Sequence, residues 1–244
     1  MRKIQVNNME LYQLTKHCWY TNSEPSTDRP SLVYVLSDNG FGIVVDAGNS
    51  PKHYKEFLAC IKQKGFPLPS LCAITHWHWD HTLGISAVNV PVIACDLTQQ
   101  HLINMSKWTE KDIDDFYMSD QCVREEYPSK DIISPSLANI VFKNELSLNI
   151  GDLEIRLIHV EGPHSDDSVL IYIPDDGMIF AGDSSAGDFS TPNISYDPVL
   201  LEKYTKTITS IPFSCFLHSH RQPLNRQETI KFLDEAKIRG YYTF

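Results

Sequence analysis

The sequence predicts an α+β protein folded as a four-layer αββα sandwich. Three observations lead to this prediction. Apolar stretches of strand length fall into two groups along the chain, stretches with helical periodicity follow each group, and polar residues capable of chemistry stand where strands end. Elements in this order bury two sheets against each other and place helices outside them. The 244 residues contain no low-complexity tract and no evident linker, so we expect a single domain, residues 1–244.

The first group of strands alternates with turns and one helix in the first 95 residues. Asp38-Asn39-Gly40 is typical of a hairpin turn between two strands. A helix is expected from Pro51 to Lys64, because proline stands near its start and Gly65 follows its end. The strands expected in this group are residues 9–14, 31–36, 41–46, 71–74 and 90–95.

A less regular segment, residues 97–135, separates the two groups. Helical patterns cover residues 98–105 and 109–118, and the segment is rich in aromatic residues. The sequence leaves two interpretations of it open: a lid or pocket wall, or a helical excursion packed on the fold. The second group then has strands expected at 140–142, 145–150, 154–160, 169–173, 178–181 and 215–217, and helices at 197–211 and 226–239.

A cluster of four metal-binding side chains follows the strand at 71–74. His76 and His78 are two residues apart, so in an extended backbone they point to the same side and can hold one ion. Asp80 and His81 are adjacent and must leave that side, and a turn there would offer them to a second ion. Buried histidine and aspartate are costly unless paired or bound to metal, which favours a metal site. Imidazole and carboxylate together suit zinc, with iron and manganese as alternatives.

The spacing His76-x-His78-x-Asp80-His81 resembles the signature of the metallo-β-lactamase-fold hydrolase superfamily, most of whose members do not cleave β-lactams. The resemblance implies the same four-layer αββα architecture, with ligands for two divalent metal ions in loops at strand ends. It also implies that Asp46, at the end of the strand 41–46, orients the metal-binding loop. A turn-forming aspartate is the alternative interpretation of this residue.

The resemblance places the remaining ligands downstream. His164 lies in a loop where the superfamily usually has Gly-His-Thr and this chain has Pro-His-Ser, and His159 is the less favoured alternative. Asp183 follows an apolar strand and could bridge two ions through its two oxygens, with a helix N-cap or turn as the alternative. His220 matches the last ligand loop, usually Gly-His-Gly, and His218 is its alternative. The implied ligands are His76, His78 and His164 for the first ion, Asp80, His81 and His220 for the second, and Asp183 between them.

This ligand set predicts a dinuclear metal-dependent hydrolase. Two divalent ions that share a water lower its pKa, so a metal-bridging hydroxide can attack an acyl carbon or a phosphorus at neutral pH, while Asp80 accepts or orients the nucleophile's proton. The expected substrate is a small-molecule ester, lactone, thioester or related acyl compound. The alternatives are a phosphodiesterase, or a non-hydrolytic iron redox or metal-binding protein on the same fold. β-Lactams are disfavoured, because β-lactamases of this fold usually lack an aspartate at the position of Asp183.

Composition restricts the partners and the compartment. A net charge of −10 disfavours a nucleic-acid partner, which usually calls for a basic surface. The six cysteines form no C-x-x-C pair and are expected to be reduced thiols. Residues 1–8 precede no apolar signal-peptide core, and no apolar run is long enough to cross a membrane, so we expect a cytoplasmic protein without a membrane partner. The sequence does not define the oligomeric state and is compatible with a homodimer.

Overall fold

Two β-sheets form the centre of the molecule. The computed structural model describes residues 9–243, and the segment 1–8, for which no signal peptide is predicted, lies outside the described residues. The first sheet holds its strands in chain order: β1 (Leu11–Gln13), β2 (Cys18–Thr21), β3 (Val33–Leu36), β4 (Gly42–Val45), β5 (Leu71–Ala73), β6 (Val92–Cys95) and β7 (Ile140–Phe142). The second sheet, in the spatial order β13-β12-β11-β10-β9-β8, consists of β8 (Glu145–Ile150), β9 (Leu153–His159), β10 (Val169–Ile173), β11 (Met178–Phe180), β12 (Cys215–Leu217) and β13 (Leu224–Asn225).

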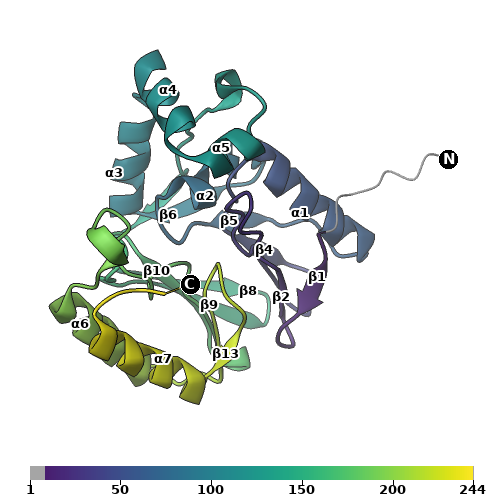
Figure 1. Ribbon diagram of the computed structural model, residues 1–244. Helices are drawn as coiled ribbons and strands as arrows, with labels where there is room; N and C mark the ends of the chain where they lie inside the picture. The colour runs from purple at the N-terminus through teal and green to yellow at the C-terminus, as the bar shows by residue number, and fades with distance from the viewer. Residues whose placement is uncertain (1–8, 244) are drawn as a thin grey trace.

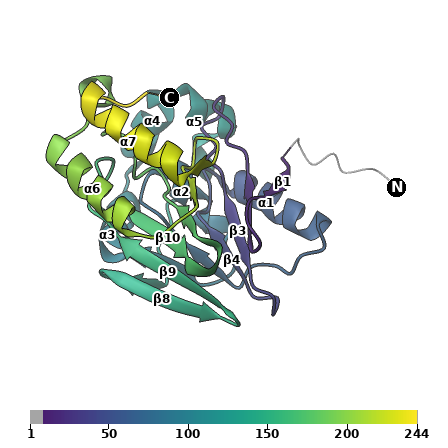
Figure 2. The ribbon, with the colours of Figure 1, turned by 90° about the horizontal axis from the view of Figure 1, so that it is seen from below.

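Helices cover the outer side of each sheet (Figure 1). Those on the side of the first sheet are α1 (Pro51–Gln63), α2 (Trp79–Thr82), α3 (Asp96–Met105), α4 (Glu110–Ser119) and α5 (Gln121–Glu126), and α6 (Pro198–Ser210) and α7 (Arg226–Arg239) cover the second. Among residues 9–243 there are also four short 3₁₀ turns: η1 (Leu83–Ala87), η2 (Lys130–Ile132), η3 (Pro174–Asp176) and η4 (Pro192–Ile194). In Figure 2 the layers run from α6 and α7, through β9 and β10 and then β3 and β4, to α1. The fold is therefore the predicted αββα sandwich.

The alternation of side chains along each strand explains the four layers. Val33 and Val35 of β3 lie in the apolar core between the two sheets, whereas Tyr34 between them lies in the core beneath α1. In the second sheet Ile171 of β10 faces the same central core, and Tyr172 packs in the core under α6 and α7. Both sheets thus bury both faces, because neighbouring residues in a strand point to opposite sides.

The segment 97–135 packs on the fold through three of its parts. Leu102 of α3, Val123 of α5 and Tyr127 after α5 are almost fully buried in the core beneath α1, while α4 has no buried residue. Helix α4 instead places Phe116 against Trp79 of the metal motif, with 5.7 Å between the ring centroids. The segment is therefore both anchored in the core and in contact with the predicted ligand loop.

The structure contains several short elements that the sequence did not predict. Strands β2 and β13 and helix α5 were not predicted, because each is too short to show a clear hydrophobic period in the sequence. Helix α2 begins at Trp79, inside the metal motif and directly after the extended backbone of His78 (ψ 148°). Asp80 and His81 therefore lie in a helical turn. Within residues 9–243, no helix is long and apolar enough to cross a membrane.

Candidate metal centre

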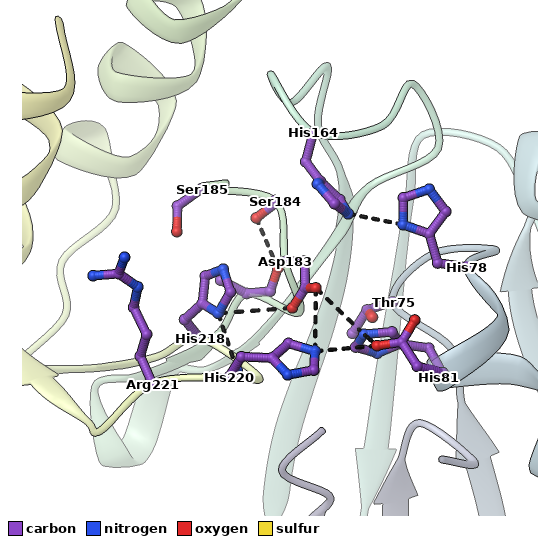
Figure 3. Close-up of polar contacts among 12 residues, drawn as sticks. Thr75, His78, His81, His164, Asp183, Ser184, Ser185, His218, His220 and Arg221 are labelled. Carbon is purple, nitrogen blue, oxygen red and sulfur yellow. Dashed lines mark hydrogen bonds and ion pairs between the residues drawn. The ribbon is translucent and has the colours of Figure 1, made fainter. Parts of the chain in front are cut away.

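The predicted ligands converge at one edge of the two sheets (Figure 3). Strand β4 runs parallel to β5, and β11 runs parallel to β12, so the carboxyl ends of each pair meet at the same edge. The metal motif follows β5, Asp183 follows β11 and His220 follows β12, while His164 lies in the loop between β9 and β10. Residues that are up to 144 positions apart in the chain thus reach one site through the ends of their strands.

Three histidines form a first cluster. His76 Nε2 lies 3.2 Å from His78 Nδ1, and His164 Nε2 lies 2.9 Å from His78 Nδ1 and 3.3 Å from His76 Nε2. The rings of His76 and His78 lie on the same side, as predicted, with their centroids 4.8 Å apart. These three nitrogens are the set predicted for the first ion, and the structure brings them together.

Two carboxylates and two histidines form a second cluster. Asp80 Oδ2 lies 3.0 Å from His81 Nε2 and 3.1 Å from His220 Nε2. Asp183 Oδ2 lies 3.6 Å from the same His81 nitrogen and 3.4 Å from the same His220 nitrogen. The structure thus joins the three residues predicted for the second ion and adds Asp183 to them. The two clusters adjoin, because the rings of His76 and His81 have centroids 4.2 Å apart.

The remaining nitrogen of several of these histidines contacts a group that fixes the ring. His81 Nδ1 lies 2.7 Å from Asp46 Oδ2, and His164 Nδ1 lies 3.0 Å from the carbonyl oxygen of Gly187. His76 Nδ1 lies 3.1 Å from Thr75 Oγ1, and that hydroxyl donates to the carboxylate of Asp46 at 2.9 Å. Fully buried Asp46 therefore orients one histidine of each cluster, the position that the resemblance implies for it.

A glycine lets the two sides of the site approach closely. Gly182 has a left-handed backbone (φ +53°), and a Cβ atom there would lie 2.5 Å from Thr75 Oγ1. Asp46 itself adopts a left-handed backbone (φ +62°), which is uncommon for a residue with a side chain. The sequence contains no signal for either conformation beyond the strand endings Asp-Ala-Gly and Ala-Gly-Asp.

The pKa values differ between the clusters. Burial, followed by the charge of His164, lowers the pKa of His78 to about 3, and burial with the charges of His81 and His78 lowers the pKa of His76 well below its usual value. In the second cluster burial opposes protonation, but the carboxylates of Asp183 and Asp80 prevail and raise the pKa of His220 to about 9. The pKa of His81 is raised well above its usual value, because Asp80, Asp46 and Asp183 outweigh the effect of burial.

The residues present fit metal ions. The Gly187 carbonyl can only accept, so His164 carries its proton on Nδ1 and directs the lone pair of Nε2 into the first cluster. The Thr75 hydroxyl donates its own proton to Asp46, so it can only accept from His76. His76 therefore carries its proton on Nδ1, and the lone pair of its Nε2 also faces the first cluster. Two lone pairs 3.3 Å apart repel each other unless a cation lies between them. In the second cluster Asp183 Oδ1 is buried and has no hydrogen-bond partner among the described residues, as expected of an oxygen left for a cation.

The alternatives weighed from the sequence lie outside both clusters. His159 Nε2 lies 2.8 Å from the backbone oxygen of Asp166. His218 is buried beside the second cluster, where its Nδ1 lies 3.7 Å from Asp183 Oδ1 and accepts the backbone N–H of His220 at 3.1 Å. Figure 3 shows His220 next to Asp183, with His218 on the side of Arg221. The geometry therefore favours His164 and His220 as ligands.

Comparisons with known proteins agree with this architecture. A family model described as "Metallo-beta-lactamase superfamily" matches residues 26–212. A metallo-beta-lactamase from Pontibacter korlensis is similar in fold, with a TM-score of 0.65 and 19% identity over 93% of this chain and 99% of that chain. TMB-1 gives a TM-score of 0.66 and 19% identity over 95% of this chain and 96% of its own.

A double mutant of the sec-alkyl sulfatase PisA1 is also similar, with a TM-score of 0.71 and 12% identity. That similarity covers 94% of this chain but 41% of the sulfatase. At these identities the likeness concerns the fold alone. A comparison with curated protein sequences gives no match.

Proposed function

Because the chain belongs to the metallo-beta-lactamase superfamily, we propose that it is a dinuclear metal-dependent hydrolase of a small-molecule ester, lactone, thioester or related acyl bond. The observation that carries this proposal is the convergence of ligand-type side chains from four separate segments into two adjoining clusters. The clusters are His76, His78 and His164, and Asp80, His81, Asp183 and His220. Imidazole and carboxylate donors of this kind support zinc as the metal.

The residues of the site have separate roles in the proposed reaction. His76, His78 and His164 would hold one divalent ion through neutral nitrogens, and His81 and His220 would hold the other together with Asp80 and Asp183. When bound, such ions supply a nucleophile from water at neutral pH and polarise the oxygen of the bond to be cleaved. The pKa of Asp80 lies well below its usual value, because the charges of His81 and His220 outweigh its burial. Asp80 is therefore ionised at neutral pH and can accept a hydrogen bond from the nucleophile.

The net charge of the chain supports a small-molecule substrate. Acidic residues outnumber basic ones and give a formal charge of −10, which opposes the binding of a nucleic-acid backbone. Aromatic side chains lie beside the first cluster: the ring of Trp77 is 4.8 Å from that of His78, and Phe189 is 5.3 Å from His164. These rings favour a substrate with an apolar part.

The proposal is tested by hydrolysis of a substrate panel with the zinc-loaded protein. The panel contains carboxyl esters, lactones, thioesters, phosphodiesters and β-lactams, and the Asp80→Ala protein is measured alongside. Asp115→Asn on the exposed face of α4 serves as the control for removal of a carboxylate. Turnover of one acyl class that is lost in Asp80→Ala and kept in Asp115→Asn would support the proposal. Turnover of phosphodiesters or β-lactams alone, or equal activity in Asp80→Ala, would contradict it.

A further inference from the structure

An aspartate outside the predicted ligand set faces the second cluster. Asp28 lies in the loop 22–30 between β2 and β3, and its Oδ1 is 3.8 Å from His220 Nδ1. Its backbone is left-handed, with φ +52°. A left-handed backbone is strained for any residue other than glycine, so it persists only where the surrounding structure enforces it. Residues strained in this way are frequent at functional sites.

The loop around Asp28 is held from three directions. Its own backbone closes a bridge, in which Glu24 N–H donates to Arg29 O at 2.8 Å and Arg29 N–H donates to Glu24 O at 3.1 Å. The buried guanidinium of Arg29 makes two hydrogen bonds of 2.9 Å to Glu126 of α5. Asn49 donates to the carbonyl oxygen of Thr27 at 2.8 Å. These contacts fix the strained backbone and direct Asp28 towards His220.

Asp46 contacts His81, the other histidine of the second cluster, as Asp28 contacts His220. His81 and His220 both direct Nε2 to Asp80 Oδ2, at 3.0 and 3.1 Å. Each presents Nδ1 to an aspartate whose backbone is left-handed, namely Asp46 for His81 and Asp28 for His220. An acceptor on the second nitrogen of a metal-binding histidine fixes its tautomer and the orientation of its ring.

We propose that Asp28 is a positioning residue for His220. Its carboxylate accepts the Nδ1 proton, so that the lone pair of Nε2 faces the second ion. The 3.8 Å between Asp28 Oδ1 and His220 Nδ1 is an ion-pair distance, and the Asp28 side chain is 39% exposed, which leaves it free to rotate towards the ~3 Å of a hydrogen bond. The inference rests on the proposed function in one respect, which is that His220 binds a metal.

The test replaces Asp28 in two ways. Asp28→Gly removes the carboxylate and also relieves the left-handed strain, so the folded state should lose no stability. We expect it to bind the second zinc ion about tenfold more weakly while the first ion is unaffected. Asp28→Asn keeps an oxygen that can accept the Nδ1 proton and should restore most of that affinity. Asn193→Gly, at another left-handed residue (φ +60°), is the control and should change neither affinity.

Zinc affinities are measured by competition with a chelator, and the cobalt-substituted protein reports the coordination of the second ion by its absorbance. Unchanged binding of both ions by Asp28→Gly would overturn the inference and leave the proposed function intact. Equal losses in the Gly and Asn variants, or equal weakening of both ions, would overturn it as well, because the effect would then not pass through His220 Nδ1. Fewer than two zinc ions bound by the unsubstituted protein would overturn the dinuclear function and this inference together.

Discussion

The two clusters at the edge of the sheets share one sequence motif but differ in charge. The first contains histidines alone, and the low pKa values of His76 and His78 make both rings neutral at pH 7. The second contains two carboxylates beside His81 and His220, whose pKa values are raised. The first cluster can therefore accept a cation without releasing a proton from these two rings, whereas the second must exchange protons for the metal. Four side chains within six residues of the sequence thus contribute to two clusters of different charge.

Removal of a ligand should have the largest effect and should separate the clusters. His78→Ala takes one nitrogen from the first cluster alone, and Asp183→Asn takes the charge of the carboxylate that contacts both histidines of the second. Because loss of an outer partner costs about 10–100-fold, we expect each variant to lose more than ~100-fold in turnover. Metal content per chain, measured by mass spectrometry, should fall by one ion in His78→Ala. Full metal content in either variant would contradict the assignment.

Replacement of Asp46 should weaken both clusters at once. Asp46→Asn keeps the shape of the side chain but removes the charge that holds His81 and, through Thr75, His76. We expect the affinity for both ions to fall by about 10–100-fold. Competition with a chelator measures each affinity. A loss confined to one ion would show that Asp46 supports a single cluster.

The close approach at Gly182 should matter for folding and for the site. Gly182→Ala combines left-handed strain with a Cβ placed 2.5 Å from Thr75 Oγ1, and should lower the free energy of unfolding by about 2–4 kcal/mol. Gly65→Ala is the matched control, because Gly65 is also left-handed (φ +74°) but has no atom within 4 Å of an added Cβ. That control should cost about 1–2 kcal/mol and leave activity unchanged. Urea unfolding measures both, and equal losses would show that the contact with Thr75 is unimportant.

Release of protons on metal binding should give the smallest signal of these tests, and it distinguishes the two clusters most directly. His220, with a pKa of about 9, is protonated at pH 7.5 in the metal-free protein, and the pKa of His81 is raised in the same direction by the neighbouring carboxylates. Zinc uptake by the second cluster should therefore release protons, and calorimetry in buffers of different ionisation enthalpy detects them. His78→Ala should leave this release intact. Because a raised histidine pKa stabilises the folded state below its unfolded value, the metal-free protein should lose stability as the pH rises from about 6.5 through about 9.

The sequence was sufficient for the architecture and for the set of side chains that the structure brings together beyond the strand ends. In β3 and β10, side chains alternate between the core between the two sheets and the core beneath the helices, where Tyr34 and Tyr172 lie. This alternation could be predicted from the strand positions alone. The spacing of two residues between His76 and His78 predicts that both side chains point to the same side of the chain, as they do in the structure. The choice between His218 and His220 depends on how the loop after β12 turns, which two histidines separated by one residue do not reveal.

The role inferred for Asp28 was beyond the sequence for a different reason. No local pattern distinguishes it from other aspartates in polar loops. Its direction depends on the ion pair of Arg29 with Glu126, whose partners are 97 positions apart. A long-range contact of this kind has no signature in the neighbouring residues. The start of α2 at Trp79 was likewise hidden, because the metal motif itself forms the first turn of that helix.

The placement of every candidate ligand beyond a strand end has an evolutionary consequence. The three apolar cores lie inside the layers, and the loops that carry chemistry contribute little to them. A segment without buried residues, such as 188–191, can therefore change in sequence under selection for a new substrate without loss of the stability that the cores provide. Stability and specificity are encoded by largely separate sets of residues, so this scaffold can acquire new activities in small, individually tolerable steps.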